Sequence, residues 1–543
     1  MKKHFKIYLI LGIALVFGLG MLFEWVLLRP NLISSEQRKI KEVLDIVSKK
    51  YVDNIDMDSL VELSIPNLLT SLDPHSVYIP SNDREAVDGE LEGSFSGIGI
   101  EFRIENDMIV VSQVIPGGPS EKVGLMAGDR IIEIDDENVA NIGIDEEGVR
   151  SRLRGKKDSK VVIKVDRDGV DQAITFDIVR GDVPMTSIDA SYLLEDNIGY
   201  IKVNRFSRTT YAEFLQAIAT IISEGADRGS DIDALVVDLR GNTGGYMEPA
   251  LLMANEFLPA DRIIVSTKGR DSRMNETVKS DGTGGLQNVR LVVLVDELTA
   301  SASEIFSGAM QDNDRGLIMG IRTFGKGLVQ QPIELRDGSE IRLTVQRYYT
   351  PSGRSIQKDY TPGKNDEYEA EIFERYRSGE LMAIDSTKVN TNLIFKSSTG
   401  RELFGGGGIL PDIFVPTDTI WSNSYLKEVS RKGLIQKFAT ENVSLNRPQL
   451  MQAKNIDELM SMLPSDEVLI WSFADYAMQN DVKPRWYYIN LSAPIIVTQI
   501  KALIANDILG RNSFYEIYNT IDLDVKESLK ALNEGKADFP ITN

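Results

Sequence analysis

Cysteine is absent from this chain of 543 residues, and histidine occurs only twice, at His4 and His75. The lack of thiols excludes disulfides, thiolate metal sites and cysteine nucleophiles. Two histidines so far apart cannot form an H-E-x-x-H zinc site, and a Ser-His-Asp triad would depend on recruiting His75 from a distant segment. Hydrolytic chemistry elsewhere in the chain therefore needs a base other than histidine.

Positive charge is also scarce relative to negative charge. The chain has 60 Lys and Arg against 81 Asp and Glu, a formal net charge of −21. Because phosphate binding depends on clustered Lys and Arg, this balance argues against a nucleic-acid partner. The 42% hydrophobic content is that of a globular protein, and the length allows several cored domains. No G-x-x-x-x-G-K-[ST] phosphate loop occurs, and the sequence calls for no cofactor and no metal.

One long hydrophobic run stands at the N-terminus. Lys2, Lys3 and Lys6 precede residues 7–28, which are apolar except for Glu24. A helix of this length measures about 33 Å and can span a hydrocarbon core of about 30 Å. The preceding charges predict a cytoplasmic N-terminus, an anchor in the inner membrane, and a body in the periplasm or outside the cytoplasmic membrane. No small-x-small cleavage site follows, which favours an uncleaved anchor over a removed signal peptide.

Residues 31–85 are predicted to be helical, because apolar residues recur at helical spacing from Ile40 to Val47. The segment ends in the turn sequence LDPHS, residues 72–76. His75 lies in that turn, where a histidine more often makes a local hydrogen bond than serves as a catalyst or ligand.

Residues 86–183 show short alternating runs that predict a β-rich unit with two short helices, at 119–127 and 145–154. The unit resembles a PDZ domain, with Gly97, Ile98, Gly99 and Ile100 where that family has its carboxylate-binding loop. The resemblance implies that these N–H groups hold a peptide C-terminus while the next strand pairs with the peptide. A hairpin bulge is the alternative interpretation of this G-x-G-x sequence.

Residues 184–415 alternate strand and helix patterns, which predicts an α/β core with functional loops at strand ends. The expected strands are 198–203, 234–239, 291–295, 317–321 and 340–349, and the expected helices are 211–224, 249–257 and the segment after Ala300. After residue 416 the pattern predicts a packed helical appendage, with helices near 423–438, 466–480, 493–508 and 524–534. This appendage contains three of the four tryptophans and no catalytic constellation.

Residues 291–330 carry the candidate chemistry. A strand, a tight turn and a helix place Ser301 at the turn, and Lys326 follows it by 25 residues in a Gly-Lys-Gly sequence. We hypothesise that Ser301 is a nucleophile and Lys326 its base, because burial disfavours an ammonium and lets lysine accept a proton. Gln330 is four residues further on and can aim the amine. The N–H of Ala302 is a candidate oxyanion donor, and the Gly244-Gly245 turn can supply a second.

Each of these features also has a structural interpretation. A serine that starts a helix is more often an N-cap, and a lysine in a glycine turn is more often solvated. Asn242-Thr243-Gly244-Gly245 can be a structural turn or a phosphate loop. Ser303 competes with Ser301 as the nucleophile and cannot be distinguished from it by composition.

Five separated motifs narrow the choice: DLRGNTGG (238–245), ASASEIFSGAMQD (300–312), TFGKGLVQQ (323–331), YYTPSGRSIQ (348–357) and GGGGILPDI (405–413). With the LDPHS and PDZ-like segments, they closely resemble the carboxyl-terminal processing peptidases, the tail-specific serine proteases of peptidase family S41. The resemblance spans about residues 35–415 and implies a crotonase-like α/β core. It implies a dyad of Ser301 and Lys326 assisted by Gln330, an oxyanion hole from Ala302 and Gly244, and a PDZ domain that receives substrate C-termini.

The expected organisation is a multidomain α/β protein with the divisions 1–30 (transmembrane anchor), 31–85 (helical segment), 86–183 (PDZ domain), 184–415 (protease core) and 416–543 (C-terminal helical domain). The expected function is extracytoplasmic cleavage of proteins whose C-termini the PDZ domain recognises. A non-catalytic PDZ scaffold and a hydrolase of small esters or amides are the alternatives. The sequence does not give the oligomeric state, and a homo-oligomer is compatible with it.

Overall fold

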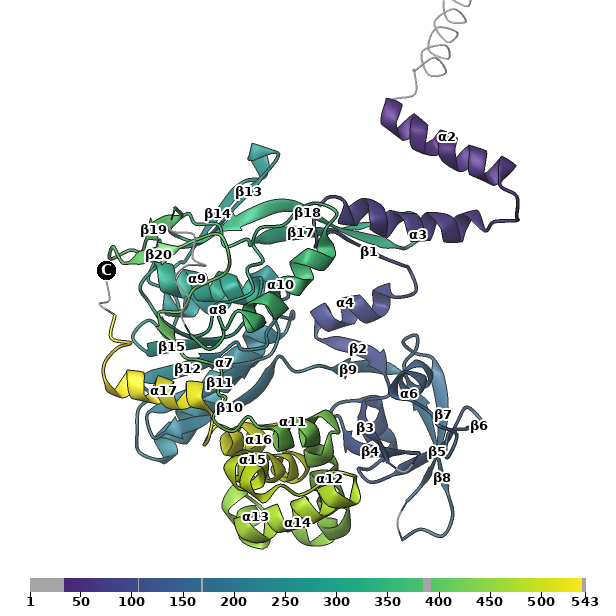
Figure 1. Cartoon of the computed structure of the whole chain (residues 1–543), viewed down its shortest axis with the longest axis vertical. Coiled ribbons are helices and arrows are strands. Elements are labelled where there is room, and N and C mark those ends of the chain that lie inside the picture. Colours follow the sequence, from purple (N-terminus) through teal and green to yellow (C-terminus); the bar gives the residue numbers. More distant parts are fainter. Residues whose placement is uncertain (1–33, 106, 168, 384–391, 540–543) are drawn as a thin grey trace, which may run out of the picture. The chain divides into compact units, whose positions relative to one another are not determined.

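The computed structural model describes residues 34–105, 107–167, 169–383 and 392–539 (Figure 1). The predicted membrane anchor, residues 7–28, lies outside this part of the chain. The described residues up to Leu68 belong to one compact unit and those from Leu69 to a second. The first unit contains α2 (Ser35–Lys50) and most of α3 (Met57–Thr70), as the helical spacing of this region predicted.

The PDZ-like region contains an antiparallel sheet in the order β3-β4-β5-β7-β8, with β6 paired to β5. Its strands are β3 (Ile100–Glu105), β4 (Met108–Val114), β5 (Arg130–Ile134), β6 (Glu137–Asn138), β7 (Lys160–Asp166) and β8 (Ile174–Val179). Beside this sheet are the pair β2 (Ser94–Gly97) and β9 (Gly181–Pro184), and the helices α4 (Arg84–Glu92), α5 (Pro119–Val123) and α6 (Glu146–Leu153). The helix predicted for 119–127 is shorter than expected, because the chain leaves the helix at Gly124 with a φ of 84°.

The α/β core predicted over residues 184–415 is built on a six-stranded sheet in the order β10-β11-β12-β15-β16-β21. Its strands are β10 (Ile188–Glu195), β11 (Ile198–Val203), β12 (Ala234–Asp238), β15 (Arg290–Val295), β16 (Leu317–Gly320) and β21 (Ile413–Phe414). Only β10 runs antiparallel to its neighbour, and the other neighbouring pairs are parallel. The central strands are almost wholly buried, which is why they read as continuous apolar runs rather than alternating ones.

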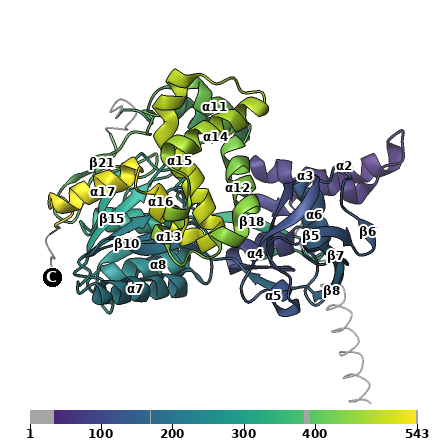
Figure 2. The ribbon, with the colours of Figure 1, turned by 90° about the horizontal axis from the view of Figure 1, so that it is seen from below.

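Helices cover both faces of this sheet (Figure 2). The helices α7 (Thr210–Asp227), α8 (Met247–Phe257) and α9 (Ala302–Asp312) pack on one face through a large apolar cluster. The second face is covered by C-terminal residues of α17 (Leu523–Asn533), with α16 (Arg511–Tyr518) beside β10. The loops that follow β12 and β15 leave the carboxyl ends of neighbouring parallel strands, so Gly244 and Ser301 meet at one edge of the sheet.

A second, five-stranded antiparallel sheet adjoins this core, and the sequence pattern identified only its longest strand. Its members are β1 (Val77–Ile79), β13 (Ile263–Gly269), β14 (Glu276–Lys279), β17 (Leu328–Glu334) and β18 (Glu340–Tyr349). Three of the missed strands, β1, β14 and β17, are brief or largely exposed, so they lack a strong apolar pattern. The remaining elements before residue 416 are η1 (Ser272–Met274), α10 (Asn365–Arg377), β19 (Ile394–Lys396) and β20 (Glu402–Phe404).

The C-terminal region is helical as expected, but it has more helices than predicted. They are α11 (Ser424–Arg431), α12 (Leu434–Leu450), α13 (Ile456–Met462), α14 (Asp466–Gln479), α15 (Trp486–Leu509), α16 and α17. The helix expected over 423–438 breaks because Gly433 takes a φ of 66° between α11 and α12. Among the described helices, α15 alone is long and apolar enough to cross a membrane, and it is the core helix of a buried apolar cluster here.

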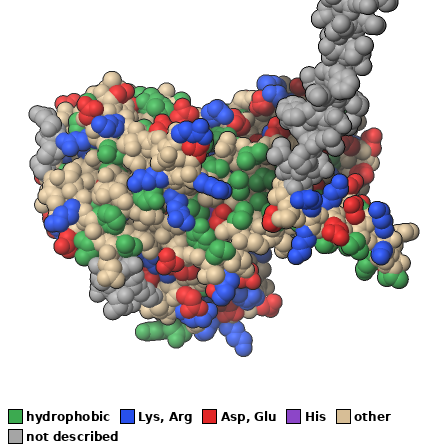
Figure 3. Space-filling model, turned by 90° about the horizontal axis from the view of Figure 1, so that it is seen from above, with side chains coloured by type: hydrophobic (Ala, Val, Ile, Leu, Met, Phe, Trp, Pro, Cys, Tyr) green, Lys and Arg blue, Asp and Glu red, His purple; other side chains and the backbone are tan. Residues whose placement is uncertain are grey.

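The surface is mixed in charge and polarity. The face drawn in Figure 3 carries Lys and Arg side chains as well as Asp and Glu, with hydrophobic side chains between them.

Candidate active site

Ser301 lies at the start of α9, immediately after the loop that follows β15. Its backbone has φ 56° and ψ −115°, a region that residues with a Cβ atom rarely occupy. The neighbouring glycine turn holds it there: a Cβ atom on Gly244 would come within 2.8 Å of the Ser301 Cβ atom. Only glycine therefore fits at Gly244, whose own φ is 103°.

The carboxylate of Glu304 connects the serine to the lysine. Its Oε2 atom accepts hydrogen bonds from the N–H groups of Ser301 at 2.9 Å and Lys326 at 2.8 Å. Its Oε1 atom accepts from the Thr323 hydroxyl at 2.5 Å and the Gly325 N–H at 2.7 Å. Burial raises the pKa of Glu304 to about 7, although these four donors act in the opposite direction. One buried side chain thus fixes the backbone at both predicted catalytic residues.

Glu304 was missed as a site residue by the sequence analysis. A signal was present, because a glutamate three residues after a helix-starting serine is the pattern of a capping box. The pattern predicts the bond from Glu304 to Ser301, but it cannot predict the bonds to the segment around Lys326.

The amine of Lys326 is buried and held by a neighbouring amide. Its Nζ atom donates to Oε1 of Gln330 at 3.0 Å, the contact that the four-residue spacing suggested. Burial lowers the pKa of Lys326 below its ordinary value, although the carboxylates of Glu304 and Asp73 oppose this effect. A lysine in this setting can lose its proton far more readily than one on the surface.

A tyrosine gives a second connection between the two predicted catalytic residues. The Tyr348 hydroxyl lies 3.1 Å from the carbonyl oxygen of Ser301 and 2.6 Å from that of Lys326. Tyr348 comes from β18 and is buried, so its position is set by the second sheet.

His75 contributes its backbone rather than its ring. Its carbonyl oxygen accepts a hydrogen bond from Nε2 of Gln330, while its ring Nε2 lies 2.8 Å from the Tyr368 hydroxyl. Burial, with the nearby charge of Lys326, lowers the pKa of His75 to about 3, so the ring is neutral at ordinary pH. Asp73 shapes the turn by accepting bonds from the N–H groups of His75 at 2.9 Å and Ser76 at 2.8 Å.

A single cleft of 820 Å³ brings the predicted residues together. Its lining includes all five residues of the predicted dyad, assisting amide and oxyanion hole: Ser301, Lys326, Gln330, Ala302 and Gly244. Ser303, the competing nucleophile, is absent from this lining; it is fully buried and its hydroxyl donates to the carbonyl of Asn242 at 3.0 Å. Access to the cleft therefore favours Ser301 over Ser303.

In the glycine turn, the N–H group left unpaired by the described residues belongs to Gly245, whereas the prediction named Gly244. The N–H of Gly244 donates to Oδ1 of Asn242 at 2.9 Å. Among the described residues, the N–H groups of Gly245 and Ala302 have no acceptor. The N–H group of Ala302, the predicted oxyanion donor, is thus unpaired among these residues, and on the turn the unpaired N–H group is that of Gly245.

The Gly97–Ile100 loop, which is predicted to bind a substrate carboxylate, has two N–H groups without a partner among the described residues. Within the described part of the chain, the N–H groups of Ile98 and Gly99 donate to no acceptor. Gly97 ends β2, opposite Gly181 of β9, and Ile100 begins β3. Because β3 is an end strand of its sheet, it has an edge to which a peptide strand can add.

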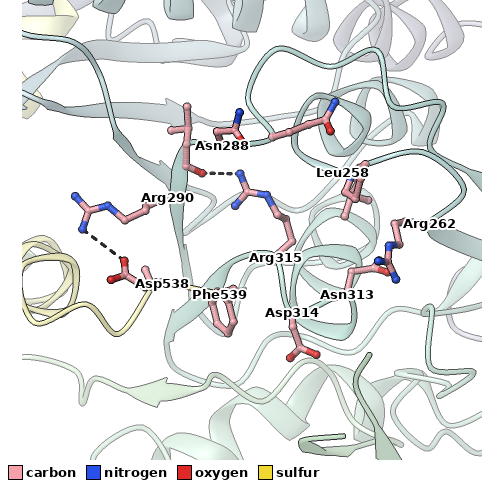
Figure 4. A pocket seen from close by; sticks show the side chains of 13 residues that line it. Leu258, Arg262, Asn288, Arg290, Asn313, Asp314, Arg315, Asp538 and Phe539 are labelled. Atoms are coloured by element: carbon pink, nitrogen blue, oxygen red, sulfur yellow. Dashed lines mark hydrogen bonds and ion pairs between the residues drawn. The ribbon is translucent and has the colours of Figure 1, made fainter. Parts of the chain in front are cut away.

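A smaller cavity of 210 Å³ lies at the opposite end of the core strands and has a different character (Figure 4). Its lining has no serine, and Arg315 within it donates to the carbonyl oxygens of Phe257 at 2.7 Å, Leu286 at 2.6 Å and Val289 at 2.5 Å. Arg315 thus braces the surrounding loops. Among the described residues, no three His, Cys, Asp or Glu side chains are grouped to hold a metal ion.

Comparison with known proteins finds a matching family model within three regions of the chain. The model of peptidase family S41 matches residues 197–364, a PDZ model matches residues 96–178, and a family of unknown function matches residues 425–510. The chain is 35% identical over 319 residues to the carboxy-terminal-processing protease of Bartonella bacilliformis, which covers 58% of this chain and 71% of that protein. It is 32% identical over 325 residues to the carboxy-terminal processing protease CtpB of Bacillus subtilis, with 59% and 65% covered.

Among solved structures, the photosystem II D1 C-terminal processing protease is similar to 72% of this chain and 95% of its own, at 26% identity and a TM-score of 0.35. The PDZ domain of the carboxy-terminal protease of Vibrio cholerae, solved with a peptide, covers 17% of this chain and 99% of its own at 29% identity and a TM-score of 0.16. The sequence relatives define a serine-type peptidase with a PDZ domain. The chain belongs to the carboxy-terminal-processing proteases of peptidase family S41.

Proposed function

We propose that this chain is an ATP-independent serine endopeptidase, anchored in the membrane by residues 7–28, that acts outside the cytoplasm through Ser301 and Lys326. The observation that carries the dyad is the buried Lys326 amine, 3.0 Å from Gln330, in the same cleft as Ser301. The ring of His75 is directed to Tyr368 instead, which supports lysine as the base. Substrates are proteins whose C-termini enter the PDZ groove.

Each proton transfer in the reaction can be assigned to a residue of this arrangement. Neutral Lys326 accepts the Ser301 hydroxyl proton as Oγ attacks the scissile carbonyl carbon, and the oxyanion is held by the N–H groups of Ala302 and the glycine turn. Collapse of the tetrahedral intermediate breaks the C–N bond, and the Lys326 ammonium gives its proton to the leaving amine. Water then hydrolyses the ester, and Lys326 takes and returns a proton in the same way.

Gln330 has a positioning role in this scheme. It accepts from Lys326 through Oε1 and donates to the His75 carbonyl through Nε2, so its orientation is set from both ends. A neutral partner holds the amine without adding a negative charge that would raise its pKa.

The decisive experiment incubates the full chain in detergent with an unfolded protein that ends in an apolar tail. We expect cleavage by the wild type and by Ser303→Ala, and none by Ser301→Ala or Lys326→Ala. Cleavage that survives in Ser301→Ala would refute the assignment, whereas loss only in Ser303→Ala would move the nucleophile by two residues. Tail binding without cleavage by the wild type would support a PDZ scaffold instead. Protease accessibility of the body in intact cells tests the proposed location.

A further inference from the structure

The segment at the start of α17 contacts the loop that carries the glycine turn. Arg240 lies in this loop, two residues after the end of β12, and its Nη1 atom donates to Asp522 at 3.0 Å and Asp524 at 2.9 Å. Both carboxylates stand at the start of α17, where Asp522 also caps the helix by accepting from the Val525 N–H at 3.0 Å. Two residues near the C-terminus are therefore paired with a residue that lies four positions before Gly244.

The other side of the Arg240 guanidinium is held by the core. Its Nη2 atom donates to Oδ2 of Asp238 at 2.6 Å, and its Nε atom lies 3.1 Å from both oxygens of that carboxylate. Asp238 also accepts from the Tyr200 hydroxyl at 2.8 Å and the Lys202 amine at 3.1 Å. Although burial alone would raise it, Arg240 and Lys202 hold the pKa of Asp238 well below its usual range. Asp238 thus accepts hydrogen bonds from three residues, and Nη1 of Arg240 is paired instead with the carboxylates of Asp522 and Asp524.

Hydrogen bonds join the loop after Arg240 to the segment that precedes Ser301. The Gly241 N–H donates to the Asp296 carboxylate at 2.9 Å, and the Asn242 carbonyl accepts from the Ala300 N–H at 3.0 Å. Asn242 then holds Gly244 through its side chain. A shift at Arg240 is therefore expected to displace the glycine turn, which packs against Ser301.

Apolar contacts fix α17 in place on the sheet. Val525 and Leu532 are buried with Val236, Val292 and Leu294 of the central strands. Figure 2 shows α17 on the face of this sheet opposite to α7 and α8. At the far end, Asp538 lies 3.7 Å from Arg290, beside the smaller cavity (Figure 4). The segment is therefore a part of the core rather than a tail.

We propose that Asp522 and Asp524 are positioning residues for the oxyanion-binding turn, through which the C-terminal segment takes part in catalysis. This inference rests on the proposed protease function. The paired carboxylates complete the donor set of Arg240 and hold the 240–245 loop in the geometry that receives a tetrahedral intermediate. Only α16 and a short turn separate this segment from residues 425–510, which match the family of unknown function.

The test compares Asp522→Asn/Asp524→Asn with the wild type and with Asp538→Asn, all as full chains in detergent. The control, Asp538→Asn, removes a carboxylate that pairs with Arg290 in the core. That ion pair lies beside the smaller cavity rather than at the glycine turn. We expect the double variant to lose at least tenfold in kcat with KM within twofold, and Asp538→Asn to match the wild type. Binding of a peptide boronate, which forms a tetrahedral adduct on Ser301, should weaken in parallel with kcat in the double variant alone.

Unchanged kcat and boronate affinity in the double variant would overturn the inference while leaving the protease assignment intact. A wild-type chain without activity would overturn both. If the double variant fails to fold, judged by circular dichroism, the single variants Asp524→Asn and Asp524→Glu decide. We then expect Asp524→Glu to retain more kcat than Asp524→Asn, and equal kcat values for the two would refute a role of the carboxylate.

Discussion

In the proposed mechanism, the charge state of Lys326 decides whether Ser301 can be activated. Its ammonium form is penalised because the amine lies in a buried part of the cleft with an uncharged amide as its direct partner. Glutamine suits this position better than a carboxylate would, because an anion would stabilise the protonated lysine. The absence of cysteine and the pairing of the His75 ring with Tyr368 support the proposal that this amine is the base.

We expect activity to rise with pH through the lowered pKa of Lys326. Below that pKa the amine carries a proton and cannot accept one from Ser301, so kcat/KM should fall about tenfold for each pH unit of further acidification. The measurement is kcat/KM from acid to alkaline pH with a neutral peptide substrate. Lys326→Arg should lose activity by about 100-fold or more, because a guanidinium stays protonated. A wild-type profile that is flat across the range would contradict lysine as the base.

His75 is expected to behave as a structural residue. Its ring is neutral at working pH because burial lowers its pKa to about 3, and its only role toward Gln330 is through the main chain. His75→Gln should keep kcat within about tenfold of the wild type, since the new side chain can still bond Tyr368. Its pH profile should match that of the wild type. A loss as deep as that of Ser301→Ala would show instead that the ring takes part in the reaction.

At the level of elements, the N-terminus of α9 and the segment before β17 are the two parts that must be held in register. Glu304 joins them with four accepted hydrogen bonds, and Tyr348 of β18 approaches both from the other side. The strained backbone of Ser301 is maintained because these contacts and the glycine turn leave it no relaxed alternative. The capping role of Glu304 is therefore only part of what it does.

Glu304→Gln should harm both stability and turnover. An amide offers one acceptor oxygen, while its NH₂ group would face N–H donors, so at least one buried donor loses its partner at a cost of about 1–3 kcal/mol. We expect a drop of that size in the free energy of urea unfolding and a fall in kcat of about 100-fold or more. Glu248→Gln, an exposed change in the first turn of α8, is the control and should alter the unfolding free energy by less than about 0.5 kcal/mol. Wild-type kcat in Glu304→Gln would rule out the clamp.

At the scale of the whole molecule, the chain combines a protease core with a binding module and a helical C-terminal region. The PDZ loop offers the free N–H groups of Ile98 and Gly99, and β3 offers a strand edge. In the proposed function, these groups bind the substrate tail, whereas the cleft that contains Ser301 holds the scissile bond. Tail recognition and chemistry should therefore separate in kinetic experiments.

Amidation of the substrate C-terminus is the corresponding test. Charged hydrogen bonds to a carboxylate are stronger than those to a neutral amide, so we expect KM to rise about tenfold with kcat little changed. The comparison uses two substrates that differ only in this terminal group, assayed with the same full-length enzyme. Equal KM values for the two would show that the Gly97–Ile100 loop does not select a free C-terminus.

Local signals explain what could be predicted. Apolar runs and glycine turns identified β11, β12, β15 and the helices between them, because buried parallel strands and amphipathic helices leave strong patterns. The short, exposed strands β1, β14 and β17 leave no such pattern, and they were missed. The helix break at Gly433 was missed as well, because a single glycine does not by itself end an apolar periodicity.

The sequence by itself determined which groups can react. It has no thiol and no histidine within residues 291–330, and it places Ser301, Lys326 and Gln330 in short, recognisable motifs. Only the tertiary structure decided how these groups are held. Glu304 reaches Lys326, His75 reaches Gln330, and Asp522 and Asp524 reach Arg240 across as many as 284 residues. The physical reason is that each of these contacts joins elements by packing of the sheets and helices, and such long-range pairing leaves no periodic trace in either partner.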